Sequence, residues 1–286
     1  MVEEAGAARV EPLLRPRGAR LARLRWKAGR VLLAPLYVLY TRRLRAQVGS
    51  APLPNHIAVI LDGNRRWASL VGLHEPGAGH RHGADKLDEL LRWCTELGIG
   101  ELTVWALSGE NLARAGAERA ALLEILADKL SALSEKTHGQ GVRIRVFGRL
   151  ETLPEALAQT VRRVEAQTGG NRGLSLNVAL GYSGRDELVD ATRAMIRSLA
   201  AAGVPAGEMA AAVHAEVIER HLYTADHSDP DLIIRTSGEM RLSGFLPWQS
   251  SHSEFYFTDV YWPAFRELDF LRAVRTFQQR ERRFGR

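Results

Sequence analysis

Several features that mark other protein classes are missing from this chain of 286 residues. Its single cysteine, Cys94, excludes an internal disulfide and a cysteine-based zinc site, and fits a reducing compartment. No apolar run reaches the roughly 18–20 residues that a membrane-spanning helix needs. The chain also lacks the G-x-x-x-x-G-K-[ST] pattern of P-loops, and G-x-G-x-x-G after an apolar strand. P-loop nucleotide sites and dinucleotide sites are therefore disfavoured.

Positive charge is concentrated at the N-terminus. Residues 1–50 hold 11 Lys and Arg against 3 Asp and Glu, a net charge of +8, whereas the other 236 residues hold 28 against 30, a net charge of −2. A nucleic-acid-binding protein more often carries its basic residues on the folded body. We therefore expect no nucleic-acid partner.

Residues 1–53 form a basic amphipathic tail in which the apolar run 31–40 is flanked by arginines. No small-residue cleavage site follows this run, which argues against a secretory signal. One interpretation is peripheral membrane contact through residues 1–50, with apolar side chains in the lipid boundary and arginines on anionic headgroups. The alternative is a helix docked on the protein's own body, or a partly disordered tail. Either way we expect a cytoplasmic protein, and membrane contact would place it at the inner face.

From residue 54 onward, short apolar runs alternate with helical patterns. The apolar runs are residues 57–61, 102–107, 142–147, 174–180, 232–234 and 255–257. Helical spacing of apolar residues covers about 87–97, 122–133, 155–167, 186–202, 207–222 and 266–283. This alternation predicts an α/β fold with a mostly parallel sheet. Since no Pro- or Gly-rich linker interrupts residues 54–286, we expect them to form one domain.

Polar and charged clusters follow three of the expected strands. They are Asp62 to Trp67, then Ser108 to Asn111 with Arg114, and Arg235 to Ser243. In parallel sheets ligands bind beyond the carboxyl ends of the strands, so these clusters should meet at one edge. Arginines suit phosphate, Gly63 lets the backbone approach an anion, and Asp62 suits a Mg²⁺ ion bridged to a diphosphate. An ordinary strand-to-helix turn capped by Asp or Asn is the alternative for the first cluster.

Three histidines lie close together in the segment 74–82: His74, His80 and His82. They could form a metal site in a loop, although zinc ligands usually have more regular spacing. We favour His80 as a donor to phosphate or a proton relay.

Five segments, in this order, resemble the cis-prenyltransferases, also called undecaprenyl diphosphate synthases. They are HIAVILDGNRRWA, GAGHRHGADKL, ALSGENLAR, NVALGYSGRDEL and DPDLIIRTSGEMRLSGFLPWQSSHSEFYFTDVYWPAF. The terminal ERRFGR is similar to the closing R-x-G element of that family. The resemblance covers residues 54–286. It implies a catalytic domain with a six-stranded, mostly parallel sheet surrounded by helices, an apolar tunnel between sheet and helices, and a homodimer.

The resemblance also implies roles for individual residues. Asp62 would be the essential Mg²⁺-binding and catalytic aspartate, and Glu254 a second acidic residue tied to Mg²⁺, supplied across subunits in one hypothesis. The allylic diphosphate would be cradled by Gly63, Asn64, Arg65 and Arg66, with Trp67 and His80 nearby. The second-strand motif would contribute Ser108, Glu110, Asn111 and Arg114. Isopentenyl diphosphate would be bound by Arg235, Arg241 and Ser243, with Arg283 and Gly285 in the closing element.

The implied reaction is chain elongation. Mg²⁺ and the arginines stabilise the diphosphate that leaves the allylic carbon, the double bond of isopentenyl diphosphate attacks that carbon, and proton loss leaves a cis double bond. Asn111, His80 and a diphosphate oxygen all stay open as the proton acceptor.

Product length receives conflicting signals. A longer loop between Asp62 and His80, Leu112 in place of the usual Trp, and the run RTSGE-RLSGFL-WQS together resemble the actinobacterial branch that includes Z-farnesyl diphosphate synthases. Ser183 in place of a usual Gly is a further departure from the family pattern. Ala106 is small and argues for a deeper tunnel, whose floor Leu157 would help to form. We expect a short to medium product. The alternatives are a long-chain synthase that makes a lipid carrier, and a non-catalytic partner subunit of the same fold.

Overall fold

The computed structural model describes residues 36–112, 116–137 and 141–280. The chain divides into two compact units, Met1–Gln47 and Val48–Arg286. A helix covers residues 36–49. None of the helices in the described ranges is long and apolar enough to cross a membrane.

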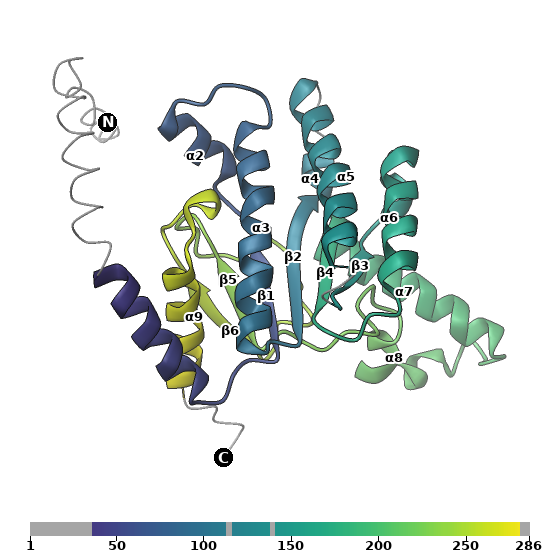
Figure 1. Cartoon of the computed structure of the whole chain (residues 1–286). Coiled ribbons are helices and arrows are strands. Elements are labelled where there is room, and N and C mark those ends of the chain that lie inside the picture. The colour runs from purple at the N-terminus through teal and green to yellow at the C-terminus, as the bar shows by residue number, and fades with distance from the viewer. Residues whose placement is uncertain (1–35, 113–115, 138–140, 281–286) are drawn as a thin grey trace, which may run out of the picture. The chain divides into compact units, whose positions relative to one another are not determined.

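A six-stranded parallel sheet forms the centre of the second unit (Figure 1), which confirms the expected fold class. Its strands are β1 (His56–Ile60), β2 (Glu101–Ser108), β3 (Arg143–Phe147), β4 (Ser175–Tyr182), β5 (Leu232–Arg235) and β6 (Glu254–Phe257). They are arranged in the order β3-β4-β2-β1-β5-β6, and every neighbouring pair is parallel. Each residue of β1 and β5 is buried, as expected for parallel strands covered on both faces.

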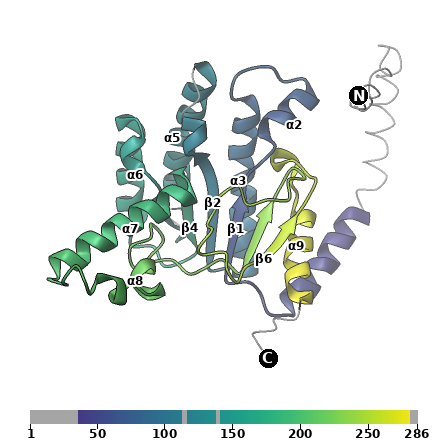
Figure 2. The same ribbon diagram turned by 180° about the vertical axis from the view of Figure 1, so that it is seen from behind.

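Helices cover both faces of this sheet. In the two opposite views, α3, α5 and α6 lie over one face and α7 with α8 over the other (Figures 1 and 2). The helices are α2 (Asn64–Val71), α3 (Ala78–Leu97), α4 (Gly109–Leu112), α5 (Ala117–Thr137), α6 (Glu155–Thr168), α7 (Gly184–Ala201), α8 (Ala215–Glu219) and α9 (Glu267–Gln279). Helix α3 buries Leu87, Leu90, Leu91 and Cys94, which recur at helical spacing.

Two expectations about helices were wrong. Residues 207–222 form only a 3₁₀ turn, Met209–Ala212, and the short α8, rather than one continuous helix. His80 and His82 lie in the first turns of α3, not in a loop. Glycines explain this, because Gly77 starts the helix at a φ of 78° and Gly79 packs directly on α2, where an added Cβ would lie 2.1 Å from the carbonyl oxygen of Asn64.

Candidate active site

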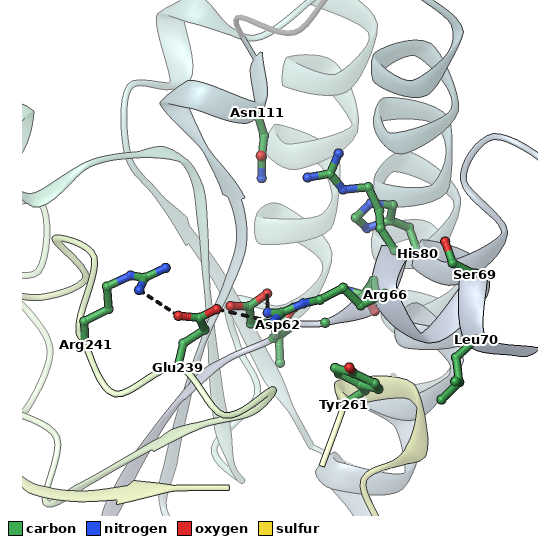
Figure 3. Close-up of a pocket in the computed structure, with 13 residues that line it drawn as sticks. Asp62, Arg66, Ser69, Leu70, His80, Asn111, Glu239, Arg241 and Tyr261 are labelled. Atoms are coloured by element: carbon green, nitrogen blue, oxygen red, sulfur yellow. Dashed lines mark hydrogen bonds and ion pairs between the residues drawn. The ribbon is translucent and has the colours of Figure 1, made fainter. Parts of the chain in front are cut away.

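The ends of β1, β2 and β5 meet at the carboxyl edge of the sheet, around a cavity of about 990 Å³ (Figure 3). The residues that line it are Leu61, Asp62, Gly63, Asn64, Arg65, Arg66, Ser69, Leu70, His80, Asn111, Glu239, Arg241 and Tyr261. The lining therefore unites residues of all three polar clusters, as expected for the open edge of a parallel sheet.

Asp62 is held through its backbone as well as its side chain. Its N–H donates to the carbonyl oxygen of Ile60 (2.9 Å) and to the hydroxyl of Thr236 (3.0 Å). Its carbonyl oxygen accepts from that same hydroxyl (2.7 Å) and from the N–H of Trp262 (3.0 Å). Thr236 is fully buried, so these bonds are shielded from water. The position of Asp62 is thus set by residues from two other loops.

The Asp62 carboxylate faces arginines. Arg235 donates to its Oδ2 (3.0 Å) and Arg66 to its Oδ1 (3.4 Å). Burial opposes ionisation, but hydrogen bonds from Arg235 and Ser237 and the charges of the two arginines outweigh it, and the pKa of Asp62 is lowered. Asp62 is therefore a negatively charged group at neutral pH, and about a third of its side chain is exposed.

A second carboxylate links two arginines across the cavity. Glu239 accepts from Arg66 (3.3 Å) through Oε1 and from Arg241 (2.6 Å) through Oε2, as the dashed lines in Figure 3 indicate. Arg66 also donates to the hydroxyl of Ser237 (2.7 Å). Without substrate, the guanidinium groups are thus held by carboxylates that a diphosphate would have to displace.

Arg235 differs from the other arginines because it is almost fully buried, with 5% exposed. It donates to the hydroxyl of Ser243 (2.9 Å) and to the carbonyl oxygen of Arg241. The structure therefore brings Arg235, Arg241 and Ser243 together, as the resemblance implies.

The turn after β1 depends on Gly63. Its φ of 98° lies in the left-handed region, and an added Cβ would lie 2.6 Å from Cδ1 of Tyr261. Helix α2 begins at the next residue, Asn64, whose side-chain amide donates to the carbonyl oxygen of Leu61 (2.9 Å). The first N–H groups of this helix lack intrahelical partners, and that favours an anion at this end.

Of the other predicted residues, some line the cavity and some do not. Asn111 and His80 line it, and the N–H of Asn111 donates to the hydroxyl of Ser108 (3.1 Å). Trp67 packs instead on the ring of His82, with centroids 4.8 Å apart. Glu110 is exposed on α4 and does not line the cavity.

Within one chain, the structure does not bring Glu254 to Asp62. Glu254 begins β6 and pairs in register with Leu232, at the amino edge of the sheet, whereas Asp62 lies beyond the carboxyl end of β1. Its carboxylate forms an ion pair with Arg280. Because all strands are parallel, the start of a strand cannot reach the edge where the neighbouring strands end.

The two predicted tunnel residues lie on different elements, Ala106 on β2 within the sheet and Leu157 on α6. Ala106 lies at an irregularity in β2, where the register with β4 shifts between Trp105 and Leu107. Leu157 is buried on α6. Arg114, Arg283 and Gly285 lie outside the described residues.

No group of three or more His, Cys, Asp or Glu in residues 36–112, 116–137 and 141–280 is placed to hold a metal ion. A metal site formed by His74, His80 and His82, the interpretation we did not favour, is therefore not supported, since all three residues are described. An ion bound at Asp62 would need further oxygen ligands besides this carboxylate.

Sequence reasoning missed five lining residues: Leu61, Ser69, Leu70, Glu239 and Tyr261. Leu61 was expected only as the end of an apolar strand. Ser69 and Leu70 follow Arg65 and Arg66 by one helical turn, so their position on α2 was the signal that could have found them. Glu239 stood within the third polar cluster. Tyr261 follows β6, a strand whose end carried no charged cluster, and its place became visible only in the folded chain.

The family model for undecaprenyl diphosphate synthases matches residues 60–285. The chain belongs to this cis-prenyltransferase family. A (2Z,6E)-farnesyl diphosphate synthase of Thermobifida fusca is 50% identical over 89% of this chain and 99% of its own length. A tritrans,polycis-undecaprenyl-diphosphate synthase (geranylgeranyl-diphosphate specific) of Methanopyrus kandleri is 44% identical over 94% of this chain and 98% of its own.

Solved structures agree with this family membership. The lavandulyl diphosphate synthase of Lavandula x intermedia, in complex with dimethylallyl diphosphate, matches with a TM-score of 0.76 and 34% identity, over 82% of this chain and 99% of that one. The cis-prenyltransferase resemblance and the expected transferase activity are thereby confirmed, and the idea of a non-catalytic partner subunit is disfavoured.

Proposed function

We propose that this cis-prenyltransferase elongates an allylic diphosphate with isopentenyl diphosphate in the 990 Å³ cavity, using the residues at the ends of β1, β2 and β5. The observation that carries the proposal is the pairing of Arg66 and Arg235 with the ionised Asp62, and of Arg241 with Glu239, at one edge of the sheet. Three arginines and two carboxylates beside a helix N-terminus suit diphosphates bound together with a divalent cation.

The residues present fit a Mg²⁺ ion. Asp62 is ionised, partly exposed and directed at the cavity, and Mg²⁺ usually takes one or two carboxylates and completes its shell with water and substrate phosphates. Bound there, the ion would neutralise charge on a diphosphate. Asp62 would hold it, and Arg235 keeps the carboxylate in the required orientation.

Groups of the chain itself would bind the two diphosphates, position them and accept the proton. Gly63 and the start of α2 offer backbone N–H groups to the allylic diphosphate, and Arg66 offers its guanidinium as that diphosphate leaves. Arg235, Arg241 and Ser243 would position isopentenyl diphosphate for attack. Asn111 and His80 both line the cavity, and either could accept the proton.

We propose a short to medium product. The Thermobifida fusca relative is named for a farnesyl product, which supports this, whereas the name of the Methanopyrus kandleri relative refers to a much longer one. Purified protein should be given Mg²⁺, radiolabelled isopentenyl diphosphate and, in turn, geranyl, farnesyl and geranylgeranyl diphosphates. A farnesyl-length product from geranyl diphosphate is expected, and undecaprenyl-length or longer chains would favour the lipid-carrier alternative. Absence of any product would contradict the function.

We propose that the enzyme is a homodimer and that Glu254 approaches the Mg²⁺ site of another subunit. The support is the position of Glu254 at the start of β6, the strand at one edge of the sheet. Asp62 of the same chain lies at the opposite, carboxyl ends of the strands. Light scattering after size exclusion should give twice the chain mass of 31.7 kDa. A monomer with full activity would contradict the proposal.

We propose that the N-terminal unit makes peripheral membrane contact. Its helix exposes the apolar residues Leu36, Val38, Leu39 and Tyr40. Arg42 and Arg43 follow them in the same helix. Deletion of residues 1–50 should abolish co-sedimentation with anionic vesicles and leave turnover intact. Binding of the full chain should weaken as salt rises. Equal binding by the truncated chain would contradict the proposal.

A further inference from the structure

Tyr261 lines the active-site cavity and belongs to none of the charged clusters at the ends of the strands. The residues before and after it are held by backbone hydrogen bonds. The N–H of Ser237 donates to the carbonyl oxygen of Val260 (2.9 Å), and the N–H of Trp262 donates to the carbonyl oxygen of Asp62 (3.0 Å). The segment around Tyr261 therefore joins the loops that follow β1 and β5.

The ring of Tyr261 is held against the turn after β1. Gly63 packs so closely on it that an added Cβ would lie 2.6 Å from Cδ1 and 3.2 Å from Cβ of the tyrosine. The next residue, Trp262, is fully buried, and its indole N–H donates to the carbonyl oxygen of Gly83 (2.8 Å). The ring thus has a fixed place at the wall of the cavity.

The guanidinium of Arg66 lies over this ring, with its carbon 5.6 Å from the ring centroid. Figure 3 shows Tyr261 beside the side chain of Arg66 as it extends from α2 toward Asp62. This distance is within the range of cation–π interactions. Arg66 is about half exposed, so a diphosphate that displaced its hydrogen-bond acceptors would leave the ring as its remaining contact among these partners.

The ring differs in kind from the other partners of Arg66. Asp62, Glu239 and Ser237 all accept hydrogen bonds from its N–H groups. A diphosphate would bind the same N–H groups and compete with these partners. The ring lies below the guanidinium carbon and does not compete for these hydrogen bonds, so the ring can stay in place when a diphosphate binds.

We propose that Tyr261 is a positioning residue that holds Arg66 by a cation–π contact, both with and without substrate, and thereby sets the affinity for the allylic diphosphate. The inference rests on the proposed function in one respect, the binding of diphosphate by Arg66. Holding a flexible cation in its bound orientation strengthens binding, because less conformational freedom is lost when the ligand arrives.

The test measures binding of inorganic pyrophosphate with Mg²⁺ by calorimetry, together with KM for each substrate and kcat. Tyr261→Leu should weaken pyrophosphate binding about three- to tenfold, the range expected for loss of a cation–π contact. KM for the allylic diphosphate should rise more than KM for isopentenyl diphosphate. Tyr261→Phe, which keeps the ring, should recover most of the loss, and Tyr261→Met provides a second variant without a ring.

A matched control is Tyr256→Leu, which removes another half-buried tyrosine from β6, outside the cavity lining. It should leave pyrophosphate binding unchanged. The decisive comparison uses Arg66→Ala. If Tyr261 acts through Arg66, Tyr261→Leu should cause no further loss in the Arg66→Ala background. Equal losses in both backgrounds would overturn the proposal.

Failure of this inference can be told apart from failure of the proposed function. If Arg66→Ala weakens pyrophosphate binding while Tyr261→Leu and Tyr261→Met do not, only the role of Tyr261 is refuted. If Arg66→Ala itself leaves binding unchanged, the diphosphate site is wrongly assigned and both proposals fail. Melting temperatures of all variants establish that each is folded.

Discussion

Gly63→Ala should lower both stability and activity, because the added methyl group would cause backbone strain and overpacking. The backbone at Gly63 has a φ of 98°, and a non-glycine residue in a left-handed conformation costs about 1–2 kcal/mol. The new Cβ would also lie 2.6 Å from Cδ1 of Tyr261 and 2.9 Å from Cβ of Ser237. Relief of such overpacking costs about 1–3 kcal/mol more. We expect the free energy of unfolding to fall by about 2–5 kcal/mol.

Gly72→Ala separates the two costs. Gly72 ends α2 with a φ of 79°, but an added Cβ would meet nothing within 4 Å. It should therefore show the backbone cost alone. Urea denaturation followed by tryptophan fluorescence gives both free energies, and steady-state kinetics gives kcat/KM. Equal loss of stability in the two variants, with kcat/KM of Gly63→Ala unchanged, would refute the close packing of Tyr261 on the turn.

Three further predictions concern the pair His56 and Glu101, the hydroxyl of Thr236, and Ala106. The free energy of unfolding should fall below about pH 6.5, the ordinary pKa of histidine, because burial lowers the pKa of His56 and only the unfolded chain then gains its proton. It should fall further from about pH 4.5, because hydrogen bonds from His227, Ser228 and Asn177 help to outweigh burial and lower the pKa of Glu101 to about 2. Urea denaturation at pH 7, 5.5 and 4 tests this, and Glu101→Gln should flatten the acidic part; no change between pH 7 and 4 would refute it. Thr236→Val should cost about 1–3 kcal/mol by removing the hydroxyl that bonds the backbone of Asp62, whereas Thr236→Ser should retain most stability in the same assay; equal loss in both would exclude the hydroxyl as the cause. Ala106→Leu should shorten the longest product seen by chromatography, and an unchanged product would exclude Ala106 from the tunnel wall.

The edge of the sheet that carries the site was predictable because three apolar runs stop abruptly at polar clusters. Asp62, Ser108 and Arg235 each end or follow a buried strand, and parallel strands place such ends together. Alternation of strands and helices likewise predicted the parallel sheet. Both inferences need only local pattern and one rule of topology.

Features that depend on distant contacts were not predictable. Tyr261 enters the site because its neighbours Val260 and Trp262 are hydrogen-bonded to Ser237 and Asp62, which lie far away in sequence. The helical start at Ala78 depends on glycines that pack against α2, so His80 was first assigned to a loop. The resemblance could assign Glu254 a role in binding Mg²⁺. Only the strand register shows that Glu254 lies at the edge of the sheet opposite to Asp62.

The most direct test of the account is incorporation of radiolabelled isopentenyl diphosphate by the wild-type chain and by Asp62→Ala, with Mg²⁺ and an allylic diphosphate. The account predicts product from the wild type, its loss with EDTA, and no turnover by an Asp62→Ala protein that still unfolds cooperatively. Turnover by Asp62→Ala at the wild-type rate would contradict the placement of the reaction at this carboxylate.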